Sequence, residues 1–262
     1  MKGINLFSRL IITITITLFF CAFVSAQTTS DDSKAKQEAE RTWDALVKIK
    51  GGREKLHSIS SVLFTLYLKN NKSLGPAWQV LHVLPDKAWQ TGYHVDGTLI
   101  TSRCIGSTEE WANPNGTGDS YNEGHPEDGF ALKRIIYLLE TKYDKPVPIA
   151  VVRRKVGKVT YDVLQASFRD WRLDFFFEPE AMLITQVIRY TKGMKPGETY
   201  TFYDYAEIDG IKMPQRESLT FLGEKSDKTW PIGINFNVDY DPNLFKGPLK
   251  SAPLDGWKRK SQ

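Results

Sequence analysis

The stretch FYDYAEIDGIKMP, residues 202–214, is the part of the sequence that decides the fold. In it, Asp209-Gly210 stands between two alternating runs of apolar and polar residues. Asp-Gly is a preferred pair for the two-residue turn of a β-hairpin, because both residues tolerate a positive φ. The stretch therefore predicts two antiparallel strands, 197–208 and 211–222, joined by this turn.

Runs of the same kind continue on both sides of this hairpin. Turn-forming residues such as Pro85-Asp86 and Lys195-Pro196-Gly197 separate them at intervals of roughly ten residues. Short strands at this spacing are typical of a meandering antiparallel sheet. Besides the hairpin, the candidate strands are 58–70, 76–84, 87–95, 98–105, 107–112, 149–156, 158–168, 171–178, 182–191 and 232–240.

Two amphipathic segments, at 33–49 and 129–142, predict helices. Apolar residues recur in each at close to helical spacing, and Gly51-Gly52 ends the first segment. Several of the predicted strands carry large apolar residues on both faces, so each of those faces must be covered. We expect the two helices to cover or plug the sheet.

The first 26 residues are typical of a secretory signal peptide. Lys2 and Arg9 flank the start of an apolar run, and Val24-Ser25-Ala26 forms a small-x-small cleavage site. The run has about 15 residues, fewer than the roughly 20 that a membrane-spanning helix needs. We expect cleavage after residue 26, no membrane span in the processed chain, and a periplasmic location, or secretion if the cell has no outer membrane.

The composition of the remaining chain is that of a globular protein. Removal of residues 1–26 leaves 33 basic against 31 acidic residues, a net charge of +2, which argues against a strongly basic nucleic-acid binder. For the full 262 residues, an apolar fraction of 41% and a charged fraction of 25% argue against a disordered chain. We expect 27–262 to form a single domain, with flexible ends at 27–33 and 250–262.

The two cysteines do not predict a disulfide. Leu18-Phe19-Phe20 precedes Cys21, and these large residues do not fit the small residues expected before a lipid-modified cysteine. Cys21 then leaves with the signal peptide, and Cys104 has no internal partner. Because Cys104 falls in a predicted strand, we expect it to be a buried thiol.

The sequence contains no P-loop, G-x-S-x-G, H-E-x-x-H or C-x-x-C motif, so we predict no catalytic residue, metal or cofactor. Two places could still hold a metal: His82 with His94 on neighbouring strands, and the carboxylates of the glycine-rich segment 113–129. An enzyme would need polar groups that converge in the interior, for which Asp174, Asp204 and His94 are the candidates.

Several stretches share their order and spacing with one family of exported proteins. Residues 45–61 read ALVKIKGGREKLHSISS, in which a helix ends at Gly-Gly and Lys-Leu-x-x-Ile-x-Ser leads into the first strand. The turn Leu84-Pro85-Asp86-Lys87 and the hairpin 202–214 are similar to turns of the same group, as are 175–180 and 241–245. In these stretches the chain resembles the outer-membrane lipoprotein-sorting proteins of the LolA/LolB type.

The resemblance implies a mainly β (α+β) fold: one unclosed antiparallel β-barrel of about 11 strands, covered by the N-terminal helix and one inserted helix. It implies a non-enzymatic, soluble protein of the cell envelope that holds acyl chains in its apolar interior and takes part in lipoprotein sorting or transport. The implied partners are acyl chains of lipids or lipoproteins and an envelope protein. We expect a monomer that binds no nucleic acid.

For this function, we expect large apolar residues of the strands to line the barrel interior. The candidates are Phe64, Leu66, Trp78, Val80, Trp89, Trp111, Phe175 and Phe202. The alternative is a filled barrel, which would make the protein a structural or interaction module of the cell envelope. Cavity volume separates the two interpretations, because a filled barrel holds no pocket of ligand size.

Overall fold

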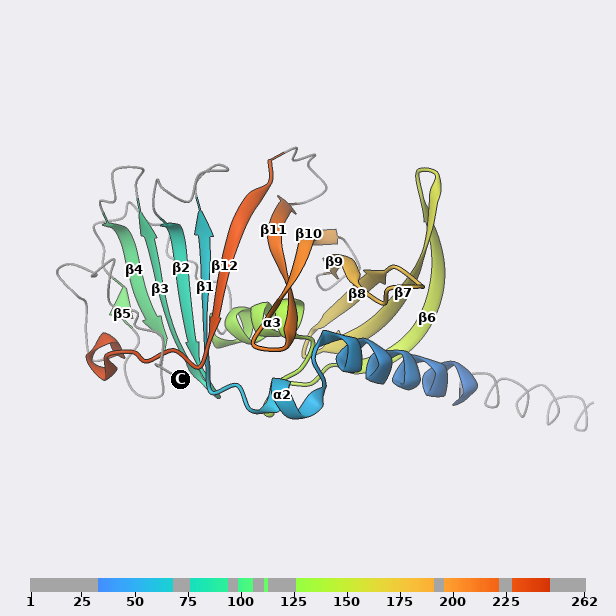
Figure 1. Ribbon diagram of the computed structural model, residues 1–262, viewed down its shortest axis with the longest axis horizontal. Helices are drawn as coiled ribbons and strands as arrows, with labels where there is room; N and C mark the ends of the chain where they lie inside the picture. Colours follow the sequence, from blue (N-terminus) through green and yellow to red (C-terminus); the bar gives the residue numbers. More distant parts are fainter. Residues whose placement is uncertain are drawn as a thin grey trace, which may run out of the picture.

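The computed structural model describes residues 33–67, 76–93, 99–105, 111–112, 126–190, 196–221 and 228–245. Within these ranges, twelve strands form one antiparallel sheet in the order β5-β4-β3-β2-β1-β12-β11-β10-β9-β8-β7-β6. The sheet curves around a concave face without closing, and β5 and β6 are its two edges (Figure 1). The predicted fold, an unclosed antiparallel barrel, is confirmed, with twelve described strands where the resemblance implied about eleven.

The chain builds the sheet in two meanders. The first runs from β1 out to the edge strand β5, and the chain then passes through α3 to the opposite edge, β6, and returns to β12. β12 closes against β1, where Val62 pairs with Phe236 and Leu66 pairs with Ile232. The bounds of the strands are β1 (Ser61–Tyr67), β2 (Pro76–Val83), β3 (Lys87–Tyr93), β4 (Leu99–Ile105), β5 (Trp111–Ala112), β6 (Val147–Val156), β7 (Val159–Phe168), β8 (Trp171–Phe177), β9 (Ile184–Tyr190), β10 (Pro196–Ile208), β11 (Ile211–Phe221) and β12 (Trp230–Phe236).

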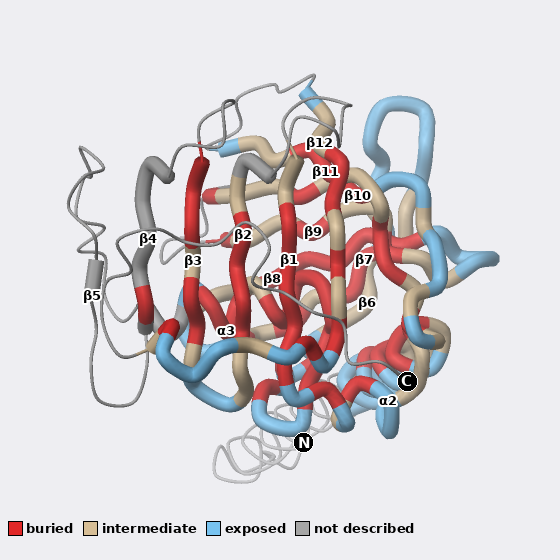
Figure 2. Tube along the Cα trace, turned by 60° about the vertical axis from the view of Figure 1, so that its left-hand side comes forward, coloured by how far each residue is buried: buried red, intermediate tan, exposed pale blue. Residues whose placement is uncertain are grey.

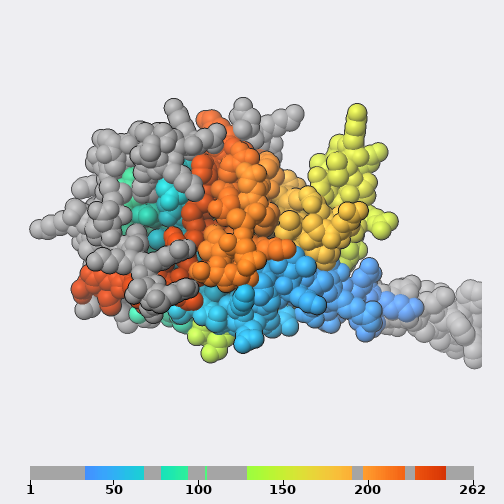
Figure 3. All heavy atoms as spheres, viewed as in Figure 1, coloured from blue at the N-terminus to red at the C-terminus, as the bar shows by residue number. Residues whose placement is uncertain are grey.

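Helices cover the concave face. An N-terminal helix occupies residues 33–50, followed by α2 (Arg53–His57), and α3 (Pro126–Leu138) lies inside the curve of the sheet (Figure 1). In the space-filling view the N-terminal helix runs along the lower side of β8 to β11 (Figure 3). One core cluster joins these helices to the sheet and includes Trp43, Leu46, Ile135, Tyr137, Phe175 and Phe202. The expected helical cover is confirmed.

The convex face of the first meander has a cover of its own. Leu63, Leu81, Trp89 and Cys104 form a second core cluster together with Leu244 and Val238 from the segment after β12. That segment ends in the short 3-10 helix η2 (Pro242–Phe245). Both faces of β1 to β3 are therefore covered. In the tube view, β1 is coloured as buried over most of its length (Figure 2). The predicted burial of Cys104 is confirmed, with 1% of its surface exposed.

The predicted Asp209-Gly210 turn is confirmed. Asp209 has φ 51° and Gly210 has φ 76°, and Ile208 pairs with Ile211 across the turn. The end of the N-terminal helix packs against this turn. A Cβ added at Gly51 would lie 2.7 Å from the carbonyl oxygen of Gly210, so only glycine allows so close an approach.

The inserted helix differs in its bounds from the expected 129–142. α3 begins at Pro126, a favoured residue for the first helical position, and ends at Leu138. Leu139 has φ 72°, outside the helical region, so the chain leaves the helix there. Glu140 consequently turns away from the helix axis. None of the helices in the described ranges has the length and apolar character needed to cross a membrane.

Candidate functional site

Four of the eight predicted lining residues, Phe64, Leu66, Trp78 and Val80, meet at one hollow on the concave face. It encloses about 220 Å³ of space between atoms, part of it open to solvent. We call it the Lys133 hollow, after the α3 lysine at its edge. Its remaining lining residues are Thr65, Lys133, Tyr137, Glu217 and Ile232.

The Lys133 hollow has a polar end. Glu217 of β11 is buried there and accepts a short hydrogen bond from the hydroxyl of Tyr137 on α3. Burial raises the pKa of Glu217 to about 7, and the nearby ammonium group of Lys133 opposes this shift. The carboxyl group therefore keeps its proton to a higher pH than an exposed glutamate does.

The other four predicted residues lie elsewhere. Phe202 lines a second, larger hollow, and Phe175 packs edge-on against Trp43 of the N-terminal helix, with ring centres 5.6 Å apart. Trp89 belongs to the cluster on the convex face and does not line either hollow. The backbone of Trp111 pairs with Cys104, while its side chain lies outside the part of the chain that can be described.

The second hollow lies between the N-terminal helix, α3 and the β10–β11 hairpin. It encloses about 360 Å³ of space between atoms, part of it open to solvent. We call it the Lys50 hollow, after the last residue of the N-terminal helix. Its lining residues are Leu46, Ile49, Lys50, Ile136, Tyr137, Leu139, Met182, Leu183, Ile184, Phe202, Tyr205, Lys212 and Pro214.

Lys50 is unusual among the buried charges. Only 9% of its surface is exposed, and its ammonium group lies 5.7 Å from the centre of the Tyr205 ring. Within the described ranges it has no hydrogen bond or ion pair. Burial lowers the pKa of its amine from 10.5 to about 7. The Gly51-Gly52 turn causes this burial, because it presses the end of the helix against the hairpin.

Tyr205 reaches this hollow because β10 twists at Asp204. Strict alternation along the strand predicts that Tyr205 faces away from Phe202, on the same side as Tyr203. Asp204 has φ 55°, which breaks the alternation, and Tyr205 lines the Lys50 hollow together with Phe202. Its hydroxyl donates a hydrogen bond of 2.6 Å to the carbonyl oxygen of Ile184. The alternation-based prediction for Tyr205 was wrong for this reason.

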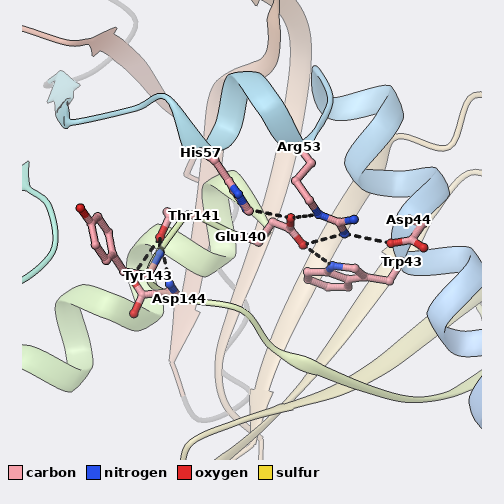
Figure 4. Close-up of polar contacts among 8 residues, drawn as sticks. All are labelled: Trp43, Asp44, Arg53, His57, Glu140, Thr141, Tyr143 and Asp144. Atoms are coloured by element: carbon pink, nitrogen blue, oxygen red, sulfur yellow. Dashed lines mark hydrogen bonds and ion pairs between the residues drawn. The ribbon is translucent and has the colours of Figure 1, made fainter.

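A third polar site, the Glu140 cluster, holds the helical layer together (Figure 4). Glu140 is fully buried and accepts hydrogen bonds from Trp43 Nε1 at 2.8 Å and Arg53 Nε at 2.5 Å. His57 Nε2 lies 3.1 Å from the same carboxylate, and Asp44 contacts Arg53 from the other side at 2.9 Å. Burial favours protonation of Glu140, but the bonds from Arg53 and Trp43 outweigh it and lower its pKa.

Of the three candidate groups for an enzyme, the two that the structure describes lie in separate ion pairs. Asp174 lies 2.6 Å from Arg154 and 3.2 Å from Arg172, as expected for a carboxylate paired with arginine. Asp204 has an exposed side chain that pairs with Arg216. His94 lies outside the described residues. These positions are separate ion pairs on strands β8 and β10.

The candidate metal sites find no support in the residues that can be described. His82 is buried between the rings of Phe64 and Phe130, and burial lowers its pKa well below the usual value. Among described residues, no three histidine, cysteine or acidic side chains gather as metal ligands would. The acidic segment 113–129 lies for the most part outside them.

Sequence reasoning missed the polar residues at these sites. Lys50, Lys133, Glu140 and Glu217 were not singled out, because charged residues at helix ends and on strands are usually exposed. For Lys50, the one signal was its position directly before Gly51-Gly52. A sharp turn at that point brings the preceding residue back against the sheet.

The hollows are small in this conformation. Side chains leave little free volume in either hollow, far less than a drug-sized or acyl ligand needs. Side chains of the helices and strands fill most of the concave face. An acyl chain could enter only if part of the helical layer moved.

Comparison with known proteins gives distant structural likenesses. No family model matches the chain, and no curated protein matches it. Among solved structures, it is similar to a DUF1329 family protein from Desulfovibrio piger, at 8% identity and a TM-score of 0.41, over 79% of this chain and 96% of that one.

Two further similar structures carry names from the group that the sequence resembles. One is a LolA superfamily protein from Nitrosomonas europaea, at 10% identity and a TM-score of 0.44, over 77% of this chain and 96% of that one. The other is a domain from Vibrio parahaemolyticus described as an outer membrane lipoprotein-sorting protein, at 14% identity and a TM-score of 0.40, over 76% of this chain and 95% of that one. These are likenesses of fold alone.

Proposed function

We propose that this protein is an exported, non-enzymatic carrier that binds acyl chains of lipids or lipoproteins against the concave face of its sheet. The observation that carries the proposal is the pair of mainly apolar hollows that lie between the helices and the strands. The resemblance of its turns and first strand to lipoprotein-sorting proteins and its signal-like first 26 residues also support it. We place the processed protein in the periplasm.

Binding would be driven by transfer of the acyl chain from water to the apolar surface of the hollows. Each Å² of acyl surface that becomes buried contributes about 25 cal/mol. A ligand that displaces part of the helical layer gains this contribution and loses the contacts that the helices made. The net affinity is therefore set by how firmly α3 and the N-terminal helix hold to the sheet.

The Glu140 cluster is a buried polar link within that layer. It connects the N-terminal helix through Trp43, α2 through Arg53, and the segment after α3 through Glu140 itself. A carrier of this design would open with the cluster intact, as a single lid, or by releasing it. Either movement exposes the two hollows to a ligand.

A filled barrel is the second candidate, and the small size of the hollows favours it. In that case the protein would act as a structural or interaction module of the cell envelope. The concave face would then be a core and not a binding site, and no ligand would be carried.

Native mass spectrometry tests the two candidates. The protein is purified without detergent from the exported fraction, which also tests its location. The carrier predicts a mass excess that disappears on extraction with organic solvent and acyl chains in the extract. A protein free of ligand that takes up no added fatty acid, phospholipid or acylated peptide would exclude the carrier and support the filled barrel.

A filling variant controls for adventitious binding. Ile49→Trp adds bulk to the Lys50 hollow, so the carrier predicts a smaller ligand-bound fraction. Ile149→Trp adds the same bulk at a residue that is 43% exposed on β6, and should leave the bound fraction unchanged. Equal bound fractions in both variants would place the ligand outside this hollow.

A further inference from the structure

We propose that the Lys50 hollow binds the carboxylate of a long-chain fatty acid, with the ammonium group of Lys50 as its counterion and the apolar wall of the hollow along the first part of the chain. This inference rests on the proposed function and names the ligand class of the same concave face. It begins from a buried cation that has no anionic partner among the described residues.

The other ionised side chains that are fully buried in the described ranges have partners, and Lys133, which is partly exposed, has the carboxylate of Glu217 near its ammonium group. Glu140 accepts from Arg53, and Asp144 lies 2.6 Å from Arg134. Asp174 lies 2.6 Å from Arg154, and Glu217 accepts from a tyrosine hydroxyl. Among the residues that the structure describes, the ammonium group of Lys50 contacts only the ring of Tyr205. A buried charge without a partner is costly, and a carboxylate that arrives from outside would supply the missing partner.

The charges around the hollow select an anion. Lys50 and Lys212 both line it, and no aspartate or glutamate is among its lining residues. The electron-rich ring face of Tyr205 compensates part of the charge of Lys50, but a ring offers no hydrogen-bond acceptor of carboxylate strength. A carboxylate would supply both the charge and the acceptor atoms.

The wall of the hollow selects an amphiphile and not a free ion. Apart from the two lysines, its lining consists of aliphatic and aromatic residues and one proline, including Leu46, Ile49 and Ile136. A small inorganic anion would gain nothing from this surface. A chain attached to the carboxylate would bury methylene groups against it, each contributing about 0.8 kcal/mol.

The limited space favours the smallest acyl headgroup. Little of the hollow is free at present, and a carboxylate needs less room than a phosphodiester with two chains. Met182 borders the hollow in a turn and has φ 52°. Its flexible thioether can adopt a new rotamer and widen the rim without a change of fold.

The test compares an acid with its ester. Binding of palmitate and of methyl palmitate to the full processed protein is measured by isothermal titration calorimetry. We expect palmitate to bind at least about tenfold more tightly than its ester, because the ester loses the charge-assisted contact. Acetate, which has the carboxylate without the chain, should not compete.

Substitutions assign the preference to one residue. Lys50→Met keeps the length and apolar stem of the side chain, and should lower the affinity for palmitate to that for the ester while leaving the ester unchanged. Lys50→Arg keeps the charge and should keep the preference. Lys48→Met removes an exposed lysine from the same helix and should change neither affinity.

The outcomes separate this inference from the proposed function. Equal affinities for acid and ester, or an acid preference that survives Lys50→Met, would overturn the carboxylate site and leave acyl binding intact. Displacement of palmitate by acetate at similar concentration would reduce the site to one for small anions. Absence of binding by either lipid would overturn the acyl carrier and the carboxylate site together.

Discussion

Glu140 lies just beyond the end of α3, and Lys50 is the last residue of the N-terminal helix. Both side chains are buried in the same helical layer. Glu140 receives three side-chain contacts, from Trp43, Arg53 and His57. Lys50 receives none from a carboxylate, and its amine rests over the ring of Tyr205. The two charges therefore differ in whether the described part of the fold supplies a hydrogen-bonded partner for them.

We interpret this difference as one of role, in which Glu140 supports the fold and Lys50 binds a ligand. A buried charge whose partners are all supplied by the chain fixes the arrangement of the elements that carry those partners. A buried charge without a partner costs stability and does not fix the arrangement of other elements. We interpret the Glu140 cluster as the joint of the helical layer and Lys50 as the binding group beneath it.

Removing the charge of Glu140 should have the largest effect on the free energy of unfolding. Glu140→Gln removes the negative charge that faces Arg53 and leaves the indole N–H of Trp43 with a weaker acceptor. We expect a loss of about 3 kcal/mol in the free energy of unfolding, below the upper values for buried pairs because Arg53 is partly exposed. Urea unfolding followed by Trp fluorescence measures it.

Asp44→Asn is the matched control for that variant. Asp44 contacts the same Arg53 at 2.9 Å, but its side chain is 62% exposed. The expected loss is below about 1 kcal/mol. Equal losses in the two variants would show that the burial of Glu140 adds nothing to the joint.

Removing the charge of Lys50 should instead raise the free energy of unfolding. Lys50→Met replaces a buried amine by an apolar side chain of similar length, and we expect a gain of about 2 kcal/mol in unfolding free energy at pH 7. Lys48→Met, at an exposed position of the same helix, should stay within about 0.5 kcal/mol of the unchanged protein. A loss of stability in Lys50→Met would mean that the amine has a stabilising partner.

The gain from Lys50→Met should depend on pH. The pKa of Lys50 falls from 10.5 in the unfolded chain to about 7 in the folded one. Between these values the unfolded chain binds more protons, so the stability of the unchanged protein rises with pH. The advantage of the variant is therefore largest below pH 7 and shrinks toward pH 10.5. A constant advantage across that window would contradict the shift.

The buried carboxyl group of the Lys133 hollow should give the stability the opposite pH dependence. The pKa of Glu217 rises from 4.5 to about 7 on folding, so the folded chain binds more protons in that window and loses stability as pH rises through it. Glu217→Gln keeps an acceptor for Tyr137 and should gain about 1 to 2 kcal/mol at pH 8, with little gain at pH 4. Thermal unfolding at the two pH values checks this, and equal gains at both would refute it.

The smallest effect should come from the hydroxyl of Tyr205. Tyr205→Phe keeps the ring beneath Lys50 and removes the hydrogen bond to the carbonyl of Ile184. We expect a loss of about 1 kcal/mol in unfolding free energy and less than a twofold change in palmitate affinity. A large loss of affinity would show that the hydroxyl, and not the ring, takes part in binding.

Local sequence signals were sufficient for the antiparallel meander and its two helices, while the unclosed barrel was predicted from the resemblance. The Asp209-Gly210 turn lies where the alternating runs predicted it, with both residues at positive φ. The two helices also lie where apolar periodicity predicted them. The end of α3 was missed, since Leu139 departs from the helix at a residue type that favours helix. Nothing in the local sequence marks that position.

The polar sites could not be predicted because they depend on distant contacts. Glu140 meets residues of the N-terminal helix and α2, more than 80 positions away along the chain. Lys50 is buried by a glycine turn that docks on the β10–β11 hairpin. Of the predicted lining residues, Trp89 needed the pairing register to show that it faces the convex side.

The most direct test of this account is the protonation of Lys50 with and without ligand. Lysine side chains labelled with carbon-13 at Cε report the pKa of the amine by NMR, and Lys50→Met assigns the signal. We predict a pKa near 7 in the free protein and a clear rise when palmitate binds, since the carboxylate stabilises the charged form beside Lys212, Tyr137 and Tyr205. An unchanged Lys50 signal in palmitate-saturated protein would contradict the claim that the ligand completes this buried charge.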